Sequence, residues 1–381
     1  MDASALLEIA SARTGLTDFG PDDFREGFYV LVDAINREAG VRESCRDALE
    51  EKFLNLLTQR LWFAKDMEVH PEIAQEHIRS PLIILSLPRT GSTKLHRMLG
   101  ATGDFQTLNF WQTMKFARVP GLPDGGRTQR IAETKAYEVW LYEQSPAMLT
   151  GHPLHAEEPE EECFLMEATY RHPTIFGMYD TPTFAAWMAQ ADPKPAYDYL
   201  VSVIKYLQWQ NGSLPKPWLF KDPNHMGQEN FLTAAYENPR FIVTHRDPVK
   251  CIPSVTSTVM ATRRIFSDQD NSHQFADKML GHLSSSMDRH MAWRARNPRI
   301  PILDLAFGDV VKEGQAVARK VFDFAGLELR PDALLAIAAW EADNPKGKHG
   351  EAKYSAEEVG STDDEIRRTF TRYYDAFGEY L

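Results

Sequence analysis

A short turn gives this chain its clearest chemical signal. Residues Pro88–Thr93 read Pro-Arg-Thr-Gly-Ser-Thr, so one arginine, one glycine and three hydroxyl side chains lie together. The turn follows the apolar run Leu82–Leu87 and precedes a helical pattern of apolar residues, Leu95, Met98 and Leu99. N–H groups at the start of a helix lack backbone partners, and the helix dipole adds positive charge there. This arrangement predicts a cradle for an anion such as phosphate.

The residue types of this cradle suit an anion, although their spacing is not that of the Walker phosphate loop. Gly91 lets the backbone approach a bound group closely, and Arg89, Ser92, Thr93 and Lys94 can add side-chain donors. The pattern G-x-x-x-x-G-K-S/T is absent, because Gly91 is the only glycine between residues 81 and 99. The alternative is an ordinary strand–turn–helix unit with a surface arginine.

A second segment could bind another anionic group. An apolar strand pattern ends at His245 and Arg246, the pair Asp247-Pro248 starts a helix, and Ser254 follows eight residues after Arg246. Proline suits the first turn of a helix. A guanidinium can hold phosphate through two parallel hydrogen bonds, and a serine two turns along the helix could add a third. The alternative is an arginine that pairs with a local carboxylate such as Asp247.

The elements that must position these groups alternate between strands and helices. This alternation predicts an α/β fold in which helices cover both faces of a parallel sheet. Ligands in such sheets bind at the carboxyl ends of the strands, so Arg89, Lys221 and Arg246 should converge there. The expected strands are Leu82–Leu87, Trp218–Lys221, Phe241–His245 and Ile302–Leu305. The expected helices cover 22 onward, 47–62, 128–145, 159–170, 277–296, 310–325 and 331–341, with a loop at 118–127.

The chain lacks repeats and linkers, which favours one domain over residues 1–381. We divide it into a helical N-terminal extension (1–78), an α/β core (79–310) and a helical C-terminal part (311–381).

Bulk properties exclude several classes of function. The net charge of −12 argues against nucleic acid and anionic membranes as partners. No apolar run approaches the length of a membrane span, and the acidic N-terminus does not resemble a secretory signal. The chain has 3 cysteines, which are far apart and suggest reduced thiols. The expectation is a cytoplasmic protein with a small-molecule ligand, and an oligomer is left open.

Four motifs in this order resemble the sulfotransferase family, in particular the large bacterial branch related to tyrosylprotein sulfotransferases. They are Pro88–Thr93, Trp218–His225, the pair Arg246 and Ser254, and Asn344–Gly350 followed by Tyr354 and Ser355. The resemblance covers the chain from about residue 15 onward. It implies a three-layer, P-loop-NTPase-like sheet flanked by helices. It also implies transfer of a sulfuryl group from 3′-phosphoadenosine 5′-phosphosulfate (PAPS) to a hydroxyl or an amine.

The resemblance further implies a role for each motif. The cradle would hold the 5′-phosphosulfate of PAPS through Arg89, Thr90, Gly91, Ser92 and Thr93. Arg246 and Ser254 would hold its 3′-phosphate, and Lys221 would support the transferring group. A C-terminal loop would close over the nucleotide, with Ser355 as a further contact. That loop carries Lys346, Lys348 and His349.

The chemistry fits these residue types. Sulfuryl transfer is an in-line displacement between two oxygens, so catalysis depends on positioning and on charge stabilisation. Arg89 and Lys221 could supply fixed positive charge to the leaving oxygen. Sulfate carries less charge than phosphate, so a divalent metal is not required. We therefore expect no metal, although His152, His155 and Glu158 offer suitable ligand types.

The general base is where the chain departs from the family pattern. Relatives commonly carry a glutamate where this chain has Gln112, and an amide accepts protons poorly. Histidine suits proton transfer near neutral pH, so His152 and His155 are substitutes, and we assign His155. Both could instead be polar loop contacts. Glu157 and Glu158 are weaker candidates, and the run 160–162 suggests a charged first turn of a helix.

The acceptor pocket is expected between residues 105 and 200. Aromatic residues that face the cradle would suit an apolar alcohol, phenol or lipid-like acceptor; most are expected to form core. Two other functions stay open: a small-molecule kinase, and a nucleotide-binding protein with impaired catalysis because of Gln112. The aromatic candidates are Phe110, Trp111, Phe116, Trp140, Tyr142, Phe164, Tyr170, Phe176, Tyr179, Phe184 and Trp187.

Overall fold

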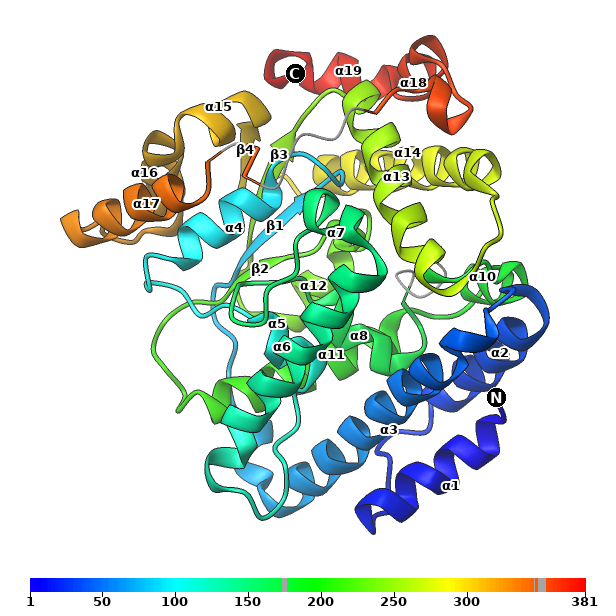
Figure 1. The fold of residues 1–381 in the computed structure, drawn as a ribbon. Helices are drawn as coiled ribbons and strands as arrows, with labels where there is room; N and C mark the ends of the chain where they lie inside the picture. Colours follow the sequence, from blue (N-terminus) through cyan, green and yellow to red (C-terminus); the bar gives the residue numbers. More distant parts are fainter. Residues whose placement is uncertain (173–176, 346, 349–353) are drawn as a thin grey trace.

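The centre of the molecule is a parallel β-sheet with the carboxyl ends of its strands at one edge (Figure 1). The computed structural model describes residues 1–172, 177–345, 347–348 and 354–381. Over these residues the sheet has the order β2-β1-β3-β4. The strands are β1 (Leu82–Ser86), β2 (Leu219–Lys221), β3 (Arg240–His245) and β4 (Ile302–Ala306). The four strands expected from the sequence are confirmed to within a residue or two at their ends.

Alternate residues of each strand face opposite layers, because side chains in a strand point to the two faces in turn. Leu82 and Ile84 of β1 belong to one buried cluster, whereas Ile83 and Leu85 belong to the other. The first cluster is covered by α4 (Ser92–Gly100), α15 (Phe307–Lys312), α16 (Gly314–Ala325) and α17 (Pro331–Asp343). The second is covered by α11 (Lys194–Gln210), α12 (Glu229–Ala235), α13 (Pro248–Phe266) and α14 (Ser272–Arg296). The predicted three-layer fold is confirmed.

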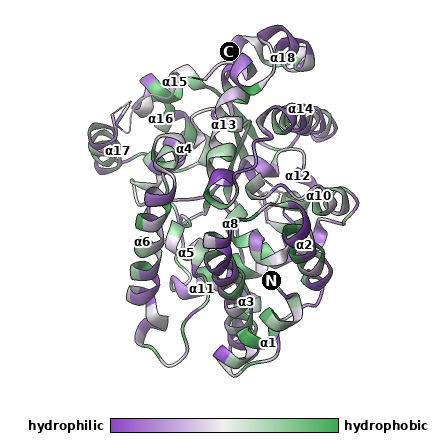
Figure 2. Ribbon diagram, turned by 45° about the vertical axis from the view of Figure 1, so that its right-hand side comes forward, coloured by the Kyte–Doolittle hydropathy of each residue, from purple (hydrophilic) through white to green (hydrophobic). Residues whose placement is uncertain are grey.

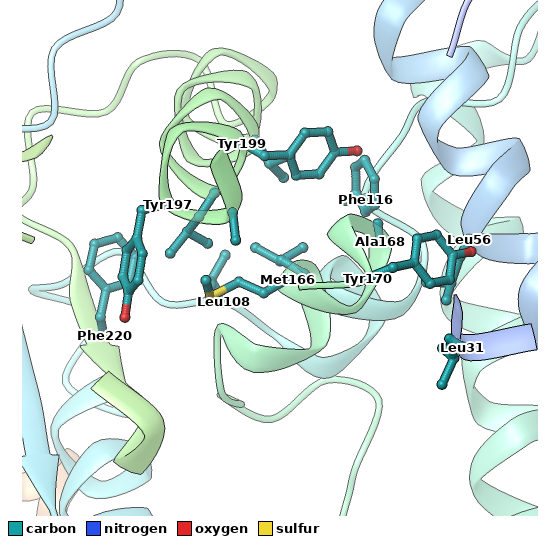
Figure 3. Packing of buried hydrophobic residues seen from close by; sticks show 14 of the residues in the cluster. Leu31, Leu56, Leu108, Phe116, Met166, Ala168, Tyr170, Tyr197, Tyr199 and Phe220 are labelled. Atoms are coloured by element: carbon teal, nitrogen blue, oxygen red, sulfur yellow. The ribbon is translucent and has the colours of Figure 1, made fainter. Parts of the chain in front are cut away.

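The N-terminal helices share the core of the sheet instead of forming a separate one. They are α1 (Ala3–Thr14), α2 (Phe24–Glu38) and α3 (Arg46–Val69). Figure 3 follows the packing from Leu31 and Leu56 through Tyr170 and Met166 to Phe220 of β2. Because one hydrophobic cluster runs through both parts, unfolding of these helices would expose part of the core that they share with the rest of the protein.

The remaining α-helices lie, along the chain, between β1 and β2 or after α17. Hydrophilic and hydrophobic residues alternate along α6 and α14, as expected for helices with one face on the core (Figure 2). Within the described residues, no helix is both long enough and apolar enough to span a membrane. The other α-helices are α5 (Phe110–Met114), α6 (Arg127–Gln144), α7 (Pro146–Gly151), α8 (Cys163–Met166), α10 (Pro182–Met188), α18 (Asp363–Thr369) and α19 (Thr371–Phe377).

Two helices were wrongly predicted. The helix expected over 159–170 is α-helical only in α8, because Pro159 pairs with Asn109 in an antiparallel bridge and its carbonyl accepts a hydrogen bond from Arg97. The helix expected over 310–325 is divided into α15 and α16 at Glu313, whose φ of −123° and ψ of 45° are not helical.

A hydrogen bond between β3 and β4, together with an ion pair from α14, holds the strand end that precedes Arg246. Asp304 of β4 accepts hydrogen bonds of 2.8 and 2.5 Å from Arg294 and contacts Nε2 of His245 at 2.9 Å. Burial alone would raise the pKa of Asp304, but the bonds from Arg294 and His245 outweigh it and hold that pKa well below its usual range. The ionised carboxylate therefore stabilises the fold.

Replacing Asp304 with asparagine is expected to destabilise the protein by about 2 to 4 kcal/mol at neutral pH, because Arg294 loses a buried anionic partner. A carboxylate with a depressed pKa contributes stability above its unfolded-state pKa of about 3.9, and that stability is lost as the pH falls below this value. Urea unfolding should therefore show a difference between wild type and Asp304→Asn that shrinks in acid. A difference that stays constant with pH would contradict this role, and the exposed Asp309→Asn is the control.

Candidate functional site

The turn after β1 has the backbone that the sequence predicted for an anion cradle. Arg89 and Gly91 have φ values of 72° and 85°, and Gly91 is the N-cap of α4 without a side-chain capping bond. A Cβ on Gly91 would lie 3.1 Å from the Phe307 ring, so a side chain there would be both strained and crowded. The first N–H groups of α4 consequently remain available for a ligand.

The side chain of Thr90 stabilises this turn through hydrogen bonds. It is fully buried, donates to the carbonyl of Leu87 at 2.9 Å, and its hydroxyl lies 2.7 Å from that of Thr244 on β3. These two bonds tie the cradle to the adjacent strand. Only the backbone N–H of Thr90 is left for a bound anion, and its hydroxyl lies away from the cavity described below.

Arg89 and Arg246 lie side by side, as their positions at adjacent strand ends predicted. Nε of Arg89 donates to Oγ of Ser254 at 3.1 Å, and Nη1 of Arg246 donates to the carbonyl of Arg89 at 2.7 Å. The guanidinium of Arg246 also stacks 4.1 Å from the centre of the Phe307 ring. The structure thus brings two cations and one hydroxyl to the same place, although they are far apart in the sequence.

These two guanidinium groups form a region of uncompensated positive charge. Burial lowers the pKa of Arg89, and the neighbouring charge of Arg246 adds to the lowering. In the part of the chain that the structure describes, neither group forms an ion pair with a carboxylate. An anion placed between them would relieve both the desolvation and the repulsion.

Lys221, at the end of β2, connects the cradle to a group of glutamates. Its Nζ donates to Oγ1 of Thr93 at 3.3 Å, forms a short ion pair with Glu161, and lies 3.7 Å from Glu160. Burial alone would lower the pKa of Lys221, but the charges of Glu161 and Glu160 outweigh it and raise that pKa. The side chain is therefore a fixed cation beside the cradle.

The run 160–162 is not the exposed first turn that its sequence suggested. Glu160 and Glu162 are both 1% exposed. Glu160 contacts Nε2 of His152 at 3.0 Å and accepts from Arg97 at 3.2 Å, and Glu162 accepts from the backbone N–H of Lys221 at 3.0 Å. Burial opposes ionisation of Glu160, yet His152 and Lys221 outweigh it and lower its pKa. These contacts explain why the segment leaves the helical conformation.

A cavity of about 450 Å³ opens beside these groups. One part of its wall is the cradle with Arg89, Arg246 and Glu161. The rest of its wall is mostly apolar and comes from four helices, α6, α7, α13 and α14, and from the segment around α8. Apolar lining residues include Leu141, Met148, Phe164, Val259, Met279 and Leu283. A cavity with anion-binding groups at one end and apolar walls at the other fits a reaction between an anionic donor and a partly apolar acceptor.

Comparison with known proteins assigns this arrangement to a family. The sulfotransferase family model matches residues 81–331, about two thirds of the chain, from the start of β1 to the start of α17. The chain belongs to the sulfotransferase family. It is therefore an enzyme of that class.

Solved structures of sulfotransferases share its fold. Sulfotransferase STF1 from Mycobacterium tuberculosis matches with a TM-score of 0.81 at 23% identity, over 98% of this chain and 99% of that chain. Sulfotransferase STF9 from Mycobacterium avium matches with a TM-score of 0.84 at 22% identity, over 98% and 96%. At such identities the likeness establishes the fold alone. No curated protein matches the sequence.

Several residues predicted for the site lie elsewhere in this sulfotransferase. His155 lies outside the large cavity: its Nδ1 is 2.7 Å from Glu138, and with Thr93 and Lys348 it lines a second cavity of about 280 Å³. Lys348 donates to Asn344 within its own loop at 3.1 Å. Lys94 turns toward α17 and pairs with Glu341 at 2.7 Å. Lys346 and His349 lie outside the described residues.

The predicted acceptor region is only part of the cavity wall. Phe164 lines the cavity, but Phe110, Phe116, Tyr170 and Phe184 are fully buried core residues. The expectation also missed the contribution of α13 and α14, which lie beyond residue 200. Apolar residues of a long helix give no sign in the sequence of which neighbour they face. Phe176 lies outside the described residues.

The sequence does not indicate that Glu161 lines the cavity, and it does not identify Glu160 as the partner of His152. Glu161 and His152 both line the large cavity, and with Glu160 they could offer three metal-ligand atoms within 4.8 Å of one another. The ammonium of Lys221 already contacts Glu160 and Glu161, so a metal ion would have to displace a buried cation. The expectation that no metal is required stays a prediction.

Proposed function

We propose that this sulfotransferase uses PAPS as its donor and transfers the sulfuryl group to a hydroxyl of a small, partly apolar acceptor. The observation that carries the proposal is the convergence of Arg89, Arg246 and Ser254 at one end of a cavity with apolar walls. Two separate sets of donors suit a nucleotide with two separate anionic groups. The cradle would take the 5′-phosphosulfate, and Arg246 with Ser254 would take the 3′-phosphate.

The proposed chemistry relies on fixed positive charge. During transfer, negative charge grows on the phosphate oxygen that leaves the sulfur, and preorganised cations stabilise that charge. Lys221 is buried and Arg89 is half-buried next to the cradle, so they need little reorganisation when the charge develops. The first N–H groups of α4 add partial positive charge at the same point. Closure of the loop around Lys346, Lys348 and His349 over the nucleotide remains part of the proposal.

The desulfated product, adenosine 3′,5′-bisphosphate, is expected to stabilise the protein against heat. A ligand that binds only the native state adds about 2.7 kcal/mol at a concentration 100 times its Kd. AMP lacks the 3′-phosphate and should raise the midpoint of unfolding much less, as should ATP. Differential scanning fluorimetry with the three nucleotides measures this difference. Equal stabilisation by AMP and the bisphosphate would remove the proposed role of Arg246 and Ser254.

The acceptor class is tested by transfer of labelled sulfate to phenols, sterols, aliphatic alcohols, sugars and peptides. Apolar walls stabilise an acceptor by about 0.8 kcal/mol for each buried methylene group, so alkyl-substituted phenols and alcohols should be the better substrates. A screen in which only carbohydrates accept sulfate would contradict the proposed acceptor while leaving the donor unaffected.

A further inference from the structure

We propose that Glu161 is the general base of the transfer and that Lys221 couples this base to nucleotide binding. The inference rests on the proposed function, because it assumes that the cradle holds the donor. It starts from one contact: the buried ammonium of Lys221 is shared between Glu161 and Thr93 of the cradle. A ligand in the cradle therefore competes with Glu161 for the same cation.

The chain needs a base from outside the usual position. Gln112 stands where the resemblance to the family places a glutamate, and its Oε1 accepts from the backbone N–H of Asn109 at 3.0 Å in a capping box. Gln112 is buried at the start of α5 and does not line the cavity. Its amide is used by the helix, so the proton of the acceptor must go elsewhere.

Glu161 is the member of its acidic run that the acceptor can reach. The side chains of Glu160 and Glu162 are at most 1% exposed, whereas that of Glu161 is 14% exposed and lines the cavity. It lines the same cavity as the cradle and Phe164, and Lys221 links it to Thr93 of the cradle. A general base must lie within hydrogen-bond reach of the hydroxyl that it deprotonates, and this position allows that.

His152 lines the same cavity but has a different role in this geometry. Its Nε2 contacts Glu160, which Arg97 and Lys221 also contact. His152 therefore helps to hold Glu160 beside Lys221. Among the residues that the structure describes, the charged and titratable groups near Glu161 include Lys221, Glu160, Glu162, His152, Arg89, Cys163 and Asp222.

Nucleotide binding would activate the base by removing its cation. The phosphosulfate attracts the Lys221 ammonium toward the leaving oxygen, and the Glu161 carboxylate loses its partner in a largely apolar cavity. A carboxylate without a counter-ion takes up a proton more readily. The acceptor O–H then gives its proton to Glu161, its oxygen forms a bond to sulfur, and the bond from sulfur to the phosphate oxygen breaks. The electron pair stays on that oxygen, beside Lys221.

The test compares acceptors that differ in acidity. Para-nitrophenol is largely ionised at mildly alkaline pH and needs no base, whereas para-ethylphenol keeps its proton. A general base contributes roughly 100- to 10,000-fold to a rate. Glu161→Gln should therefore lower kcat/KM by at least about 100-fold for para-ethylphenol and far less for para-nitrophenol, and Glu161→Asp should recover part of the loss. The control is Glu143→Gln, at an exposed glutamate near the end of α6 that does not line the cavity.

Other outcomes separate this inference from the proposed function. An equal loss with both phenols would mean that Glu161 only positions Lys221, and the same selective loss in His152→Asn instead would make His152 the base; either overturns the proposal. A second experiment needs no acceptor. Calorimetry with the bisphosphate in two buffers of different ionisation enthalpy measures how many protons the protein takes up on binding. In mildly acidic buffer, binding should take up protons in the wild type and not in Glu161→Gln, whereas at the higher pH of the transfer assay the carboxylate stays ionised and can accept the proton of the acceptor. Binding without this uptake overturns the coupling alone, whereas absence of binding overturns the donor and this inference together.

Discussion

Arg246→Ala is expected to abolish most of the preference for adenosine 3′,5′-bisphosphate over AMP. Truncating one partner of a buried, hydrogen-bonded charge pair costs about 2 to 4 kcal/mol, which corresponds to roughly 30- to 1,000-fold in Kd. AMP would not contact Arg246 through a 3′-phosphate, so its affinity should change much less. The ratio of the two dissociation constants, measured by calorimetry, isolates the 3′-phosphate from every other part of the site.

The structure indicates which controls this experiment needs. Arg246 also donates to the carbonyl of Arg89 and stacks on Phe307, so its removal could loosen the cradle and weaken AMP as well. Arg246→Lys keeps the charge but loses the planar fork, and it should recover only part of the affinity. Lys250→Ala removes an exposed charge about one turn along the helix that Arg246 precedes. An equal loss of both nucleotides in Arg246→Ala would show that the residue acts only by shaping the loop.

The parts of the fold and site that were predictable depend on local patterns. A continuous apolar run followed by a turn identifies a buried parallel strand, and its last residue is then fixed at the carboxyl edge of the sheet. For this reason the sequence alone predicts that Arg89, Lys221 and Arg246 lie close together at this edge. The cradle was predictable because its signals are local. Glycine allows a tight turn with positive φ, and hydroxyl residues are typical of the start of a helix.

The partners of Lys221 could not be predicted in the same way. Glu161 lies 60 residues before Lys221, and a run of glutamates after a proline has the pattern of an acidic first helical turn. The structure delays the helix until Glu162, the N-cap of α8, because Arg97, His152 and the backbone N–H of Lys221 bind carboxylates and a carbonyl of residues 159–162. These are long-range polar contacts, which leave no periodicity in the sequence. His155 was chosen by residue type, which does not reveal the cavity that a side chain faces.

Lys221→Met is expected to lower kcat by about 1,000-fold while the Kd of the bisphosphate changes only about fivefold. The contact between the ammonium and the leaving oxygen strengthens as charge develops there, so its loss is felt mainly in the transition state. Single-turnover transfer of labelled sulfate gives the rate, and calorimetry gives the affinity. Lys216→Met, at an exposed lysine before β2, is the control. An unchanged turnover would remove Lys221 from the mechanism.

The same variant must be checked for folding, because Lys221 neutralises buried carboxylates. Its Nζ contacts Glu160 and Glu161, and removing one partner of a buried ion pair costs about 3 to 5 kcal/mol of stability. The double variant Lys221→Met/Glu161→Gln removes one of these carboxylates and should recover part of the stability lost by Lys221→Met. It should not recover turnover, because both the cation and the proposed base are absent. If turnover and stability returned together, the single variant would have lost activity through its fold, and Lys221 would be a structural residue.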